Sequence, residues 1–252
     1  MDIKQLEQYL MQSDLGIDAK QLERFLSEMR PRRQGFSAGG ACQLHPPRQI
    51  YDFKRLMAYY RCAIMEIETK FNVINEDFSY QYERNPIESI KSRLKEPTSI
   101  RDKLARRGLA FSAASIEENL FDVAGVRVVC SFVDDVYRIA DALVQQDDIT
   151  LIRRKDYIAN PKENGYRSLH LIVAVPIFLT DQKKMMNVEI QLRTIAMDFW
   201  ASLEHQLRYK KEHLFTPEMA DDLKICADVS TELDTLMNNL AIKIHEQENP
   251  HH

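Results

Sequence analysis

The stretch from residue 160 to residue 170 constrains the fold of this chain most, and it reads Asn-Pro-Lys-Glu-Asn-Gly-Tyr-Arg-Ser-Leu-His. The Asn-Gly pair at 164–165 is a turn signal, because both residue types tolerate positive φ. We therefore expect a strand directly after the turn, with successive side chains on opposite faces. One face would carry Tyr166, Ser168 and His170, and the other Arg167, Leu169, Leu171, Val173 and Val175.

A second stretch, residues 187–193, repeats this alternation. Two neighbouring strands of this kind would bury one face of a sheet and present a phenol ring, an imidazole and a carboxylate on the other. A solvated sheet face is the usual meaning of such alternation. We favour a functional face, because a solvated one would be expected to carry Lys, Thr and Ser instead. The apolar side of the second stretch is Val188, Ile190 and Leu192, and the polar side is Asn187, Glu189, Gln191 and Arg193.

Composition allows a globular core and argues against several kinds of site. The chain has 252 residues, 44% of them hydrophobic, and its net charge of −4 argues against a broad nucleic-acid-binding surface but not against a local basic cleft. The four cysteines form no Cys-x-x-Cys pair and are expected to be reduced thiols without zinc. The sequence shows no signal peptide and no membrane-spanning apolar run, so we expect a cytoplasmic protein with no membrane contact. Since the seven glycines form no Gly-x-Gly-x-x-Gly or Walker A loop, side chains would have to hold any phosphates.

The order of helical and strand patterns predicts an α+β fold, with a mixed sheet of about five strands flanked by helices. Besides the two stretches above, strands are expected at 126–132 and 149–153. Helices are expected at 3–12, 18–29, 50–84, 134–146 and 194–211, and from Pro217 onward. We expect an N-terminal helical extension and linker at 1–47, a core at 48–211 and a C-terminal helix for oligomerisation at 212–252.

Several local expectations follow from the helical patterns. Asp134 would cap the helix at 134–146. Pro217 would occupy the first position of the last helix. On the helix at 194–211, the residues expected to face inward are Ile195, Phe199, Leu203 and Leu207. A near-heptad seam on the last helix suits packing on another helix, in the same chain or a second one. This seam consists of Leu223, Cys226, Leu233, Met237, Leu240 and Ile244.

A basic stretch, residues 86–108, surrounds the sequence Pro97-Thr98-Ser99. Thr98 or Ser99 would cap the helix that follows, whose first-turn N–H groups favour an anion. A solvated basic helix is a common alternative, but cations on both sides of a helix N-terminus make a natural polyphosphate site. The cations are Arg93, Lys95, Arg101, Lys103, Arg106 and Arg107.

Two carboxylates complete the candidate site. Asp122 lies just before an apolar strand, and Glu189 lies on the polar side of the 187–193 strand. Carboxylates at strand ends can hold Mg²⁺, which together with Arg and Lys neutralises charge on a transferring phosphoryl group. Tyr166 offers a face on which a base can stack, and Glu189 could take a proton from an attacking hydroxyl. The residue types alone therefore favour phosphoryl-group transfer on a nucleotide.

Over roughly residues 75–211 the sequence resembles the synthetase domain of the RelA/SpoT family, most closely its stand-alone small alarmone synthetases. Each matching fragment is weak alone, and their occurrence together in the family's order argues against coincidence. The fragments are Arg93-x-Lys95-x-x-x-Ser99-x-x-x-Lys103, Asp122-x-Ala-Gly-x-Arg127, Asn164-Gly-Tyr-Arg-Ser-Leu-His170 and Glu189-Ile-Gln191-x-Arg193-Thr, followed by Trp200 and Glu204-His205. The resemblance implies a nucleotidyltransferase-like synthetase core within 48–211.

The resemblance implies a (p)ppGpp synthetase. ATP would donate its β,γ-pyrophosphate to the 3′-hydroxyl of GDP or GTP, giving AMP and ppGpp or pppGpp. Asp122 and Glu189 would bind Mg²⁺, and Glu189 would activate the hydroxyl. The ATP-binding residues would be Arg93, Lys95, Ser99, Lys103 and Arg127, the last of these against the adenine ring. The GDP- or GTP-binding residues would be Lys155, Lys162, Asn164, Tyr166, His170, Gln191 and Asp198, with Tyr166 stacked on guanine.

The resemblance also bears on activity and partners. The metal-binding His and His-Asp pattern of the family's hydrolase domain is missing, so we expect synthesis without degradation. The family and the helical seam point to a homo-oligomer, a tetramer, with single-stranded RNA or (p)ppGpp as candidate allosteric ligands. One alternative is a catalytically silent RNA-binding or scaffold protein on the same fold, and another is a nucleotidyltransferase that moves AMP. The pair Asp122 and Glu189 argues against a silent protein, because a binding protein has little need for both.

Overall fold

The structure is a computed structural model, and the residues it describes are 48–82, 84–208 and 214–248. The helices predicted at 3–12 and 18–29, and the linker after them, lie outside these residues. The described chain forms two compact units. The first unit contains the beginning of helix α3 (Arg48–Tyr82), up to Ala58, and Lys95–Leu120. The second contains Tyr59–Leu94 and the chain from Phe121 onward.

The first unit contains the short helices α4 (Pro97–Arg106) and α5 (Ala113–Asn119). Ser112 caps α5, because its Oγ accepts the Ser115 N–H at 3.1 Å. No side chain caps α4, which begins at Pro97, whose fixed φ suits a first helical position. The predicted cap at Thr98 or Ser99 is therefore wrong, since both residues lie inside the first turn. The buried residues of the two helices are Ile100, Leu104 and Ile116.

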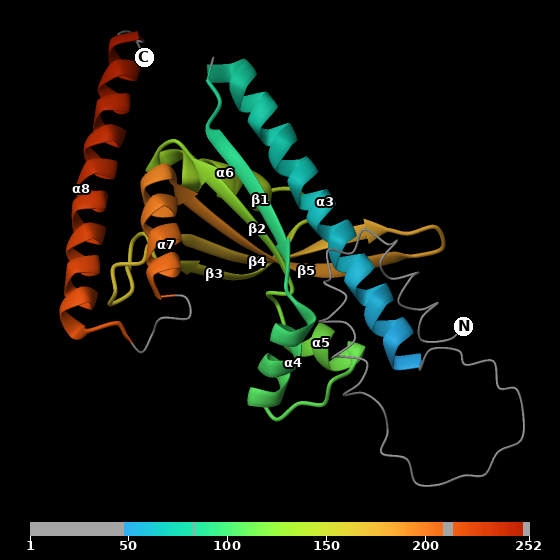
Figure 1. Cartoon of the computed structure of the whole chain (residues 1–252). Helices are drawn as coiled ribbons and strands as arrows, with labels where there is room; N and C mark the ends of the chain where they lie inside the picture. The colour runs from blue at the N-terminus through green and yellow to red at the C-terminus, as the bar shows by residue number, and fades with distance from the viewer. Residues whose placement is uncertain (1–47, 83, 209–213, 249–252) are drawn as a thin grey trace, which may run out of the picture. The chain divides into compact units, whose positions relative to one another are not determined.

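The second unit is built on a five-stranded mixed sheet (Figure 1). Its strands are β1 (Ile87–Leu94), β2 (Ala124–Cys130), β3 (Thr150–Asp156), β4 (Leu169–Phe178) and β5 (Lys183–Thr194). They lie in the order β1-β2-β5-β4-β3, with β2 and β5 parallel and all other neighbours antiparallel. This sheet and its flanking helices confirm the predicted fold class. β1 has no counterpart among the predicted strands, because its sequence, Ile-Glu-Ser-Ile-Lys-Ser-Arg-Leu, does not alternate.

One face of the sheet is apolar and forms the core of the second unit. The residues at its centre have 0% exposure: Val128, Leu169, Leu171, Ile190 and Leu192. Helix α6 (Val133–Val144) packs on β2 and β5, and its buried residues include Val136, Ile139 and Leu143. α6 begins one residue before Asp134, its N-cap residue is Phe132, and the Asp134 N–H donates to the Oδ1 of Asn238, on the last helix, at 3.4 Å. The predicted cap is therefore wrong, and Asp134 lies instead in the first turn, where the helix dipole favours a negative charge.

Helix α7 (Ile195–Arg208) does not have the predicted orientation. Its buried residues are Met197, Trp200 and Ala201, whereas Ile195, Phe199, Leu203 and Leu207 are 41–62% exposed. Both stripes have helical period, and hydrophobicity alone favours the more apolar one. The packed side is decided by the sheet and by helix α8 (Pro217–Glu248), where Trp200 donates its Nε1–H to the Leu223 carbonyl at 2.9 Å.

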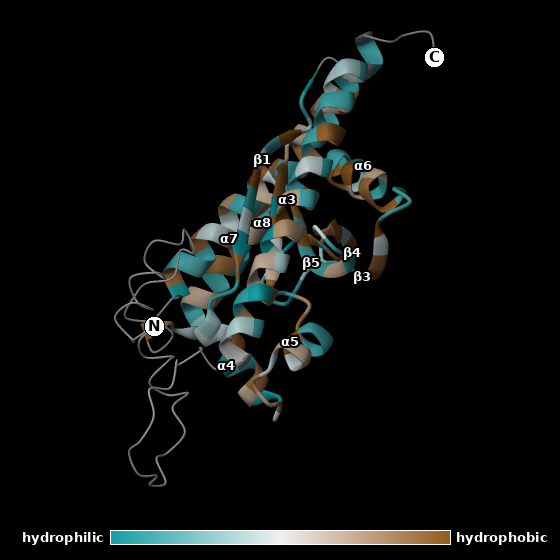
Figure 2. Ribbon diagram, turned by 90° about the vertical axis from the view of Figure 1, so that its right-hand side faces the viewer, coloured by the Kyte–Doolittle hydropathy of each residue, from teal (hydrophilic) through white to brown (hydrophobic). Residues whose placement is uncertain are grey.

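Helix α8 begins as predicted. Pro217 is its first residue, and the Oγ1 of Thr216 accepts the Met219 N–H at 3.3 Å. Figure 2 shows hydrophobic and hydrophilic residues mixed along the helices, as expected for helices that pack by one side. Much of the predicted seam is exposed, with Leu233, Met237, Leu240 and Ile244 at 49–57%. Within the part of the chain that the structure describes, no helix has the length and apolar content needed to cross a membrane.

We expect Met197→Ala to lower the free energy of unfolding by about 2–5 kcal/mol, because the substitution opens a cavity on the packed side of α7. Leu203→Ala, on the exposed side, should cost about 0.5 kcal/mol or less in a dilute sample. Urea unfolding of both variants at low protein concentration measures the difference. A larger loss for Leu203→Ala would restore the orientation predicted from the sequence.

Candidate active site

The polar face of the sheet carries two rows of residues that cross all five strands. From β1 to β3, the first row is Arg93, Gly125, Glu189, Ile172 and Arg153. In the same order, the second row is Lys91, Arg127, Gln191, His170 and Lys155. Each row has cations on its outer strands and Glu189 or Gln191 at its centre. The hydrogen-bond register of the sheet therefore assembles a cationic surface around one carboxylate.

The 160–168 loop precedes β4 and is held by its own backbone. Gly165 has a φ of +85°, the positive value that the sequence predicts. Its N–H donates to the Lys162 carbonyl at 2.8 Å, and the Lys162 N–H donates to the Tyr166 carbonyl at 3.1 Å. Asn164 closes the turn, because its Oδ1 accepts the Tyr166 N–H at 3.2 Å. The strand begins at Leu169 rather than directly after the turn, since these loop groups bond to one another and not to a neighbouring strand.

A chain of polar contacts runs from Arg193 through Tyr166 to His170. The Nη2 of Arg193 donates to the Tyr166 Oη at 2.6 Å, and this Oη lies 2.8 Å from the Nε2 of His170. Because the guanidinium can only donate, the phenol hydrogen remains for His170. We infer that Nε2 accepts this hydrogen and that Nδ1 carries the imidazole hydrogen. The Nδ1 lies 4.0 Å from the Oε1 of Glu189, so the chain leads to the central carboxylate.

The surroundings of His170 keep its imidazole neutral. Burial lowers its pKa from 6.5 to about 4, and the positive charges of Arg193, Lys162 and Lys155 contribute to the shift. A neutral imidazole has one donor and one acceptor nitrogen, so Nε2 can accept the Tyr166 hydroxyl hydrogen while Nδ1 keeps its own. His170 therefore serves as a hydrogen-bonding group and not as a cation near neutral pH.

Glu189 is the best candidate to bind a cation on this face. Its Oε2 accepts a hydrogen bond from the Gln191 Nε2 at 3.3 Å, and its side chain is 21% exposed. Gly125, its neighbour on β2, lies beneath the Arg93 side chain: a Cβ there would come into ordinary contact with the Arg93 Cγ at 3.7 Å. Asp122 comes two residues before Ala124, the first residue of β2, which pairs with Val188. Asp122 therefore precedes the part of β2 that pairs with the part of β5 carrying Glu189, and carboxylate oxygens suit a hard divalent cation.

Cations and aromatic rings surround Tyr166. The Lys162 Nζ lies 4.7 Å from the Tyr166 ring centroid and 4.8 Å from that of Tyr157. The Arg193 guanidinium carbon lies 5.1 Å from the Tyr166 centroid. Tyr157 and Tyr166 meet edge to face at 6.1 Å. The cluster therefore combines a surface on which a base can stack with cations that can meet phosphates.

Asp198, in the first turn of α7, joins the two groups of predicted nucleotide-binding residues. Its Oδ1 lies 3.1 Å from the Arg193 Nη1 and 3.2 Å from the Arg127 Nη1. Arg127 is predicted for ATP and Asp198 for the acceptor nucleotide. The two predicted sites therefore adjoin at this ion pair.

The remaining predicted residues of the ATP site belong to the first unit. Lys95 precedes α4, and Ser99 and Lys103 lie on it. Ser99 and Lys103 are four residues apart and therefore share one side of the helix. Lys103 is also in the last turn of α4.

Three residues of the second unit are absent from the predicted set but lie among or next to its members. Arg193 contacts Tyr166, Gln191 and Asp198, and its place in the alternation of β5 could have identified it. Tyr157 packs against both Tyr166 and His170, and no sequence pattern distinguishes it. Arg167 lies beside Tyr166 in the loop with its side chain 12% exposed, in agreement with the alternation, which assigns it to the apolar side with Leu169.

Comparisons with known proteins identify relatives of this chain. The family described as a region found in RelA / SpoT proteins matches residues 92–214. GTP pyrophosphokinase YwaC of Bacillus subtilis is 42% identical over 186 residues, which cover 74% of this chain and 89% of that protein. Among solved structures, small alarmone synthetase 2 from Bacillus subtilis has a TM-score of 0.69 at 42% identity, covering 77% of this chain and 99% of that one.

Small alarmone synthetase 1 from Bacillus subtilis is similar as well. Its structure with its product pppGpp has a TM-score of 0.69 at 34% identity, covering 76% of this chain and 97% of that one. Its structure with AMPCPP has a TM-score of 0.65 at 32% identity, covering 78% and 99%.

The neutral state of His170 should be visible in how stability depends on pH. Since its pKa is about 4 in the folded protein and ordinarily 6.5, the unfolded state binds more protons between these values, and stability falls as the pH falls through this window. In metal-free buffer, His170→Gln should reduce this fall in the free energy of unfolding by up to about 3 kcal/mol. The control His205→Gln changes an exposed histidine of α7 and should leave the loss unchanged. Urea unfolding across the window measures both, and an unaltered slope for His170→Gln would contradict the neutral imidazole.

Proposed function

Because the chain belongs to the RelA/SpoT family, we propose that it is a GTP pyrophosphokinase that synthesises (p)ppGpp. ATP donates its β,γ-pyrophosphate to the ribose 3′-hydroxyl of GDP or GTP, and AMP is released. The observation that carries the proposal is the carboxylate of Glu189 at the centre of the cationic sheet face, beside neutral His170. The same proposal covers synthesis without degradation, and a cytoplasmic location, where the nucleotide substrates are found.

Asp122 and Glu189 are the residues that would hold Mg²⁺, which when bound neutralises charge on the transferring pyrophosphoryl group. Glu189 has a second role in the proposal, as the base that takes the proton of the 3′-hydroxyl. Its Oε2 is held by Gln191, and its Oε1 faces the Nδ1 of His170. The hydrogen bond from Gln191 orients the carboxylate before the acceptor arrives.

The acceptor nucleotide is assigned to the surface around Tyr166. Its ring would stack on guanine, and Lys155 and Lys162 would bind phosphates. The Lys162 ammonium lies against the rings of Tyr157 and Tyr166, so it is held close to where the acceptor would bind. The other groups assigned to the acceptor are Asn164, His170, Gln191 and Asp198.

ATP is assigned to the residues that match the family's ATP-binding motifs. Arg93 and Arg127 extend from the sheet face beside Gly125 and Gln191, and Arg127 would lie against adenine. Lys95, Ser99 and Lys103 would hold the phosphates, supported by the shared side of α4 on which Ser99 and Lys103 lie. A distribution of cations over the polyphosphate suits a transition state whose charge is spread over several oxygens.

Exposed apolar residues support the proposal that the chain forms a homo-oligomer, a tetramer. Large exposed side chains occur along both α7 and α8, among them Phe199, Val229, Leu236 and Leu240 at 51–62% exposure. Contact between copies would remove these surfaces from water. We propose residues 212–252 as the oligomerisation segment, 48–211 as the pyrophosphokinase core and 1–47 as an extension. Single-stranded RNA and (p)ppGpp are the proposed allosteric ligands.

Incubation with γ-labelled ATP, GDP and Mg²⁺, followed by chromatography, tests the reaction. The label should appear on the guanosine product, and unlabelled AMP should form alongside it. Release of the label as pyrophosphate would show adenylyl transfer instead. No AMP above background would favour a silent binding protein.

In the same assay, Glu189→Gln should lower turnover by roughly 100- to 10,000-fold, because the amide can neither take the proton nor supply a negative ligand. Glu88→Gln is the matched control, since Glu88 is exposed on β1 outside the proposed site. Circular dichroism should show the same fold for both variants. Turnover near wild type in Glu189→Gln would contradict the assigned role.

Tyr166→Ala should weaken acceptor binding by about 1–3 kcal/mol through lost stacking and should change the KM for ATP less. Tyr166→Phe keeps the ring and loses the contacts of the hydroxyl with Arg193 and His170, so it separates stacking from orientation. Steady-state kinetics with GDP or ATP varied in turn give both KM values. If the acceptor KM of Tyr166→Ala stays at the wild-type value, Tyr166 is not the stacking surface.

A further inference from the structure

The inner side of α8 touches the 160–168 loop directly. A Cβ added at Gly165 would overlap the Cβ of Ala227, so the loop backbone lies against this helix. Tyr166 packs against the buried cluster of Trp200, Ala201 and Ala227, which joins α7 to α8. The loop that carries Tyr166 therefore has α8 as part of its support.

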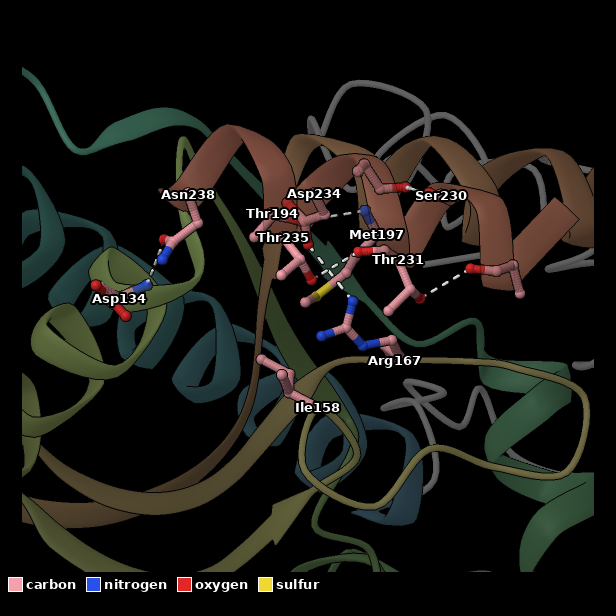
Figure 3. A network of polar contacts seen from close by, with 12 residues as sticks. Asp134, Ile158, Arg167, Thr194, Met197, Ser230, Thr231, Asp234, Thr235 and Asn238 are labelled. Atoms are coloured by element: carbon pink, nitrogen blue, oxygen red, sulfur yellow. Dashed lines mark hydrogen bonds and ion pairs between the residues drawn. The ribbon is translucent and has the colours of Figure 1, made fainter. Parts of the chain in front are cut away.

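A buried ion pair reinforces this contact (Figure 3). The Nη1 of Arg167 lies 3.5 Å from the Oδ2 of Asp234, and the two side chains are 12% and 6% exposed. Figure 3 shows Arg167 extending from the loop toward α8, where Asp234 lies. Among the residues that the structure describes, no other carboxylate lies within ion-pair distance of Arg167. Loss of Asp234 would thus leave a buried cation without its compensating charge.

The same carboxylate oxygen is tied to the end of β5. The Oγ1 of Thr194 donates to the Asp234 Oδ2 at 2.9 Å, and Thr194 also accepts the Met197 N–H at 3.2 Å at the start of α7. Burial raises the pKa of Asp234, while Thr194 and Arg167 oppose the shift. Asp234 therefore connects three elements: the loop, the β5–α7 junction and α8.

We propose that Asp234 is a positioning residue for the acceptor nucleotide, acting through Arg167 on the 160–168 loop. The inference rests on the proposed function, because it assigns the purpose of the loop that carries Tyr166. Arg167 lies between Tyr166, which faces Arg193 and His170, and Ser168, whose Oγ donates to the Leu192 carbonyl at 3.1 Å. Fixing the side chain of Arg167 against α8 limits the positions that the Tyr166 ring can adopt. A helix remote from the reacting carboxylate thus belongs to the framework of the acceptor site.

The ion pair could instead serve only to dock α8, and the two roles predict different kinetics. A docking role would lower thermal stability without distinguishing the two substrates. A positioning role would raise the KM for GDP selectively, since the pair supports the loop that is assigned to the acceptor.

The test compares Asp234→Asn, Arg167→Gln and the double variant with the control Glu232→Gln, which changes an exposed carboxylate of the same helix. Asp234→Asn should raise the KM for GDP by roughly 10-fold, with the KM for ATP within about 2-fold of wild type. The double variant should weaken acceptor binding, expressed as free energy, by less than the sum of the two single variants, because the two partners act on one another. Glu232→Gln should behave as wild type.

Hydrogen exchange of the nucleotide-free protein supplies a readout that needs no activity. The amides of Lys162, Gly165 and Tyr166 are bonded within the loop and should exchange roughly 10-fold faster in Asp234→Asn. If Asp234→Asn does not fold, Arg167→Gln carries the same test from the other side of the pair, and Arg167→Lys should partly restore both readouts.

Equal changes in the KM for GDP and for ATP, or additive losses in the double variant, would overturn the proposal. Unchanged exchange of the three loop amides would also overturn it. A wild-type protein that makes no AMP would refute the proposed function instead, and faster loop exchange in Asp234→Asn would then still show that Asp234 holds the loop.

Discussion

The parallel pairing of β2 with β5 is the constraint on which the rest of the site depends. It sets Gly125 beside Glu189 and Arg127 beside Gln191, and the antiparallel neighbours extend both rows to the outer strands. Side chains alternate between faces, so a shift of one residue would bring Val126 to Glu189 and turn charged groups into the apolar core. The complete burial of Val128, Ile190 and Leu192 makes such a shift costly. The core on one face thereby fixes the chemistry on the other.

The charges of the site are unevenly distributed for a chain whose net charge is −4. Arginines and lysines gather on the polar face of the sheet and around Tyr166, and the carboxylates among them are few and specifically paired. Asp198 lies between two guanidinium groups, and Asp234 holds Arg167 behind the loop. The other cations of the face are accessible to an anionic ligand. Polyphosphate recognition by side chains rather than by a glycine-rich loop is consistent with this arrangement.

Predictions from local patterns were wrong where two faces of one element showed the same hydrophobic period, or where residue type alone was used to place a cap. On α7, the stripe through Phe199 and Leu203 and the stripe through Met197 and Trp200 are both helical, and the packing of Trp200 on α8 decided between them. Ser99 and Asp134 are good cap residues by type, but each helix begins before them. β1 does not alternate, so only its pairing with β2 defines it as a strand. The role of Arg167 could be inferred only once α8 was known to pack against the loop, because no sequence pattern links residues 167 and 234.

The sequence by itself determined the strand faces, the turn at Gly165, the class of fold and the polar residues of β4 and β5, because alternation and turn chemistry are local properties of the chain. The motifs also identified most of the candidate site, including Glu189, Tyr166 and His170. Only the tertiary structure decided which distant residues meet. The neutral state of His170, the junction at Asp198 and the support of the loop by α8 all arise from burial and from contacts between segments far apart in the chain. Such contacts depend on the packing of whole elements, which no local pattern encodes.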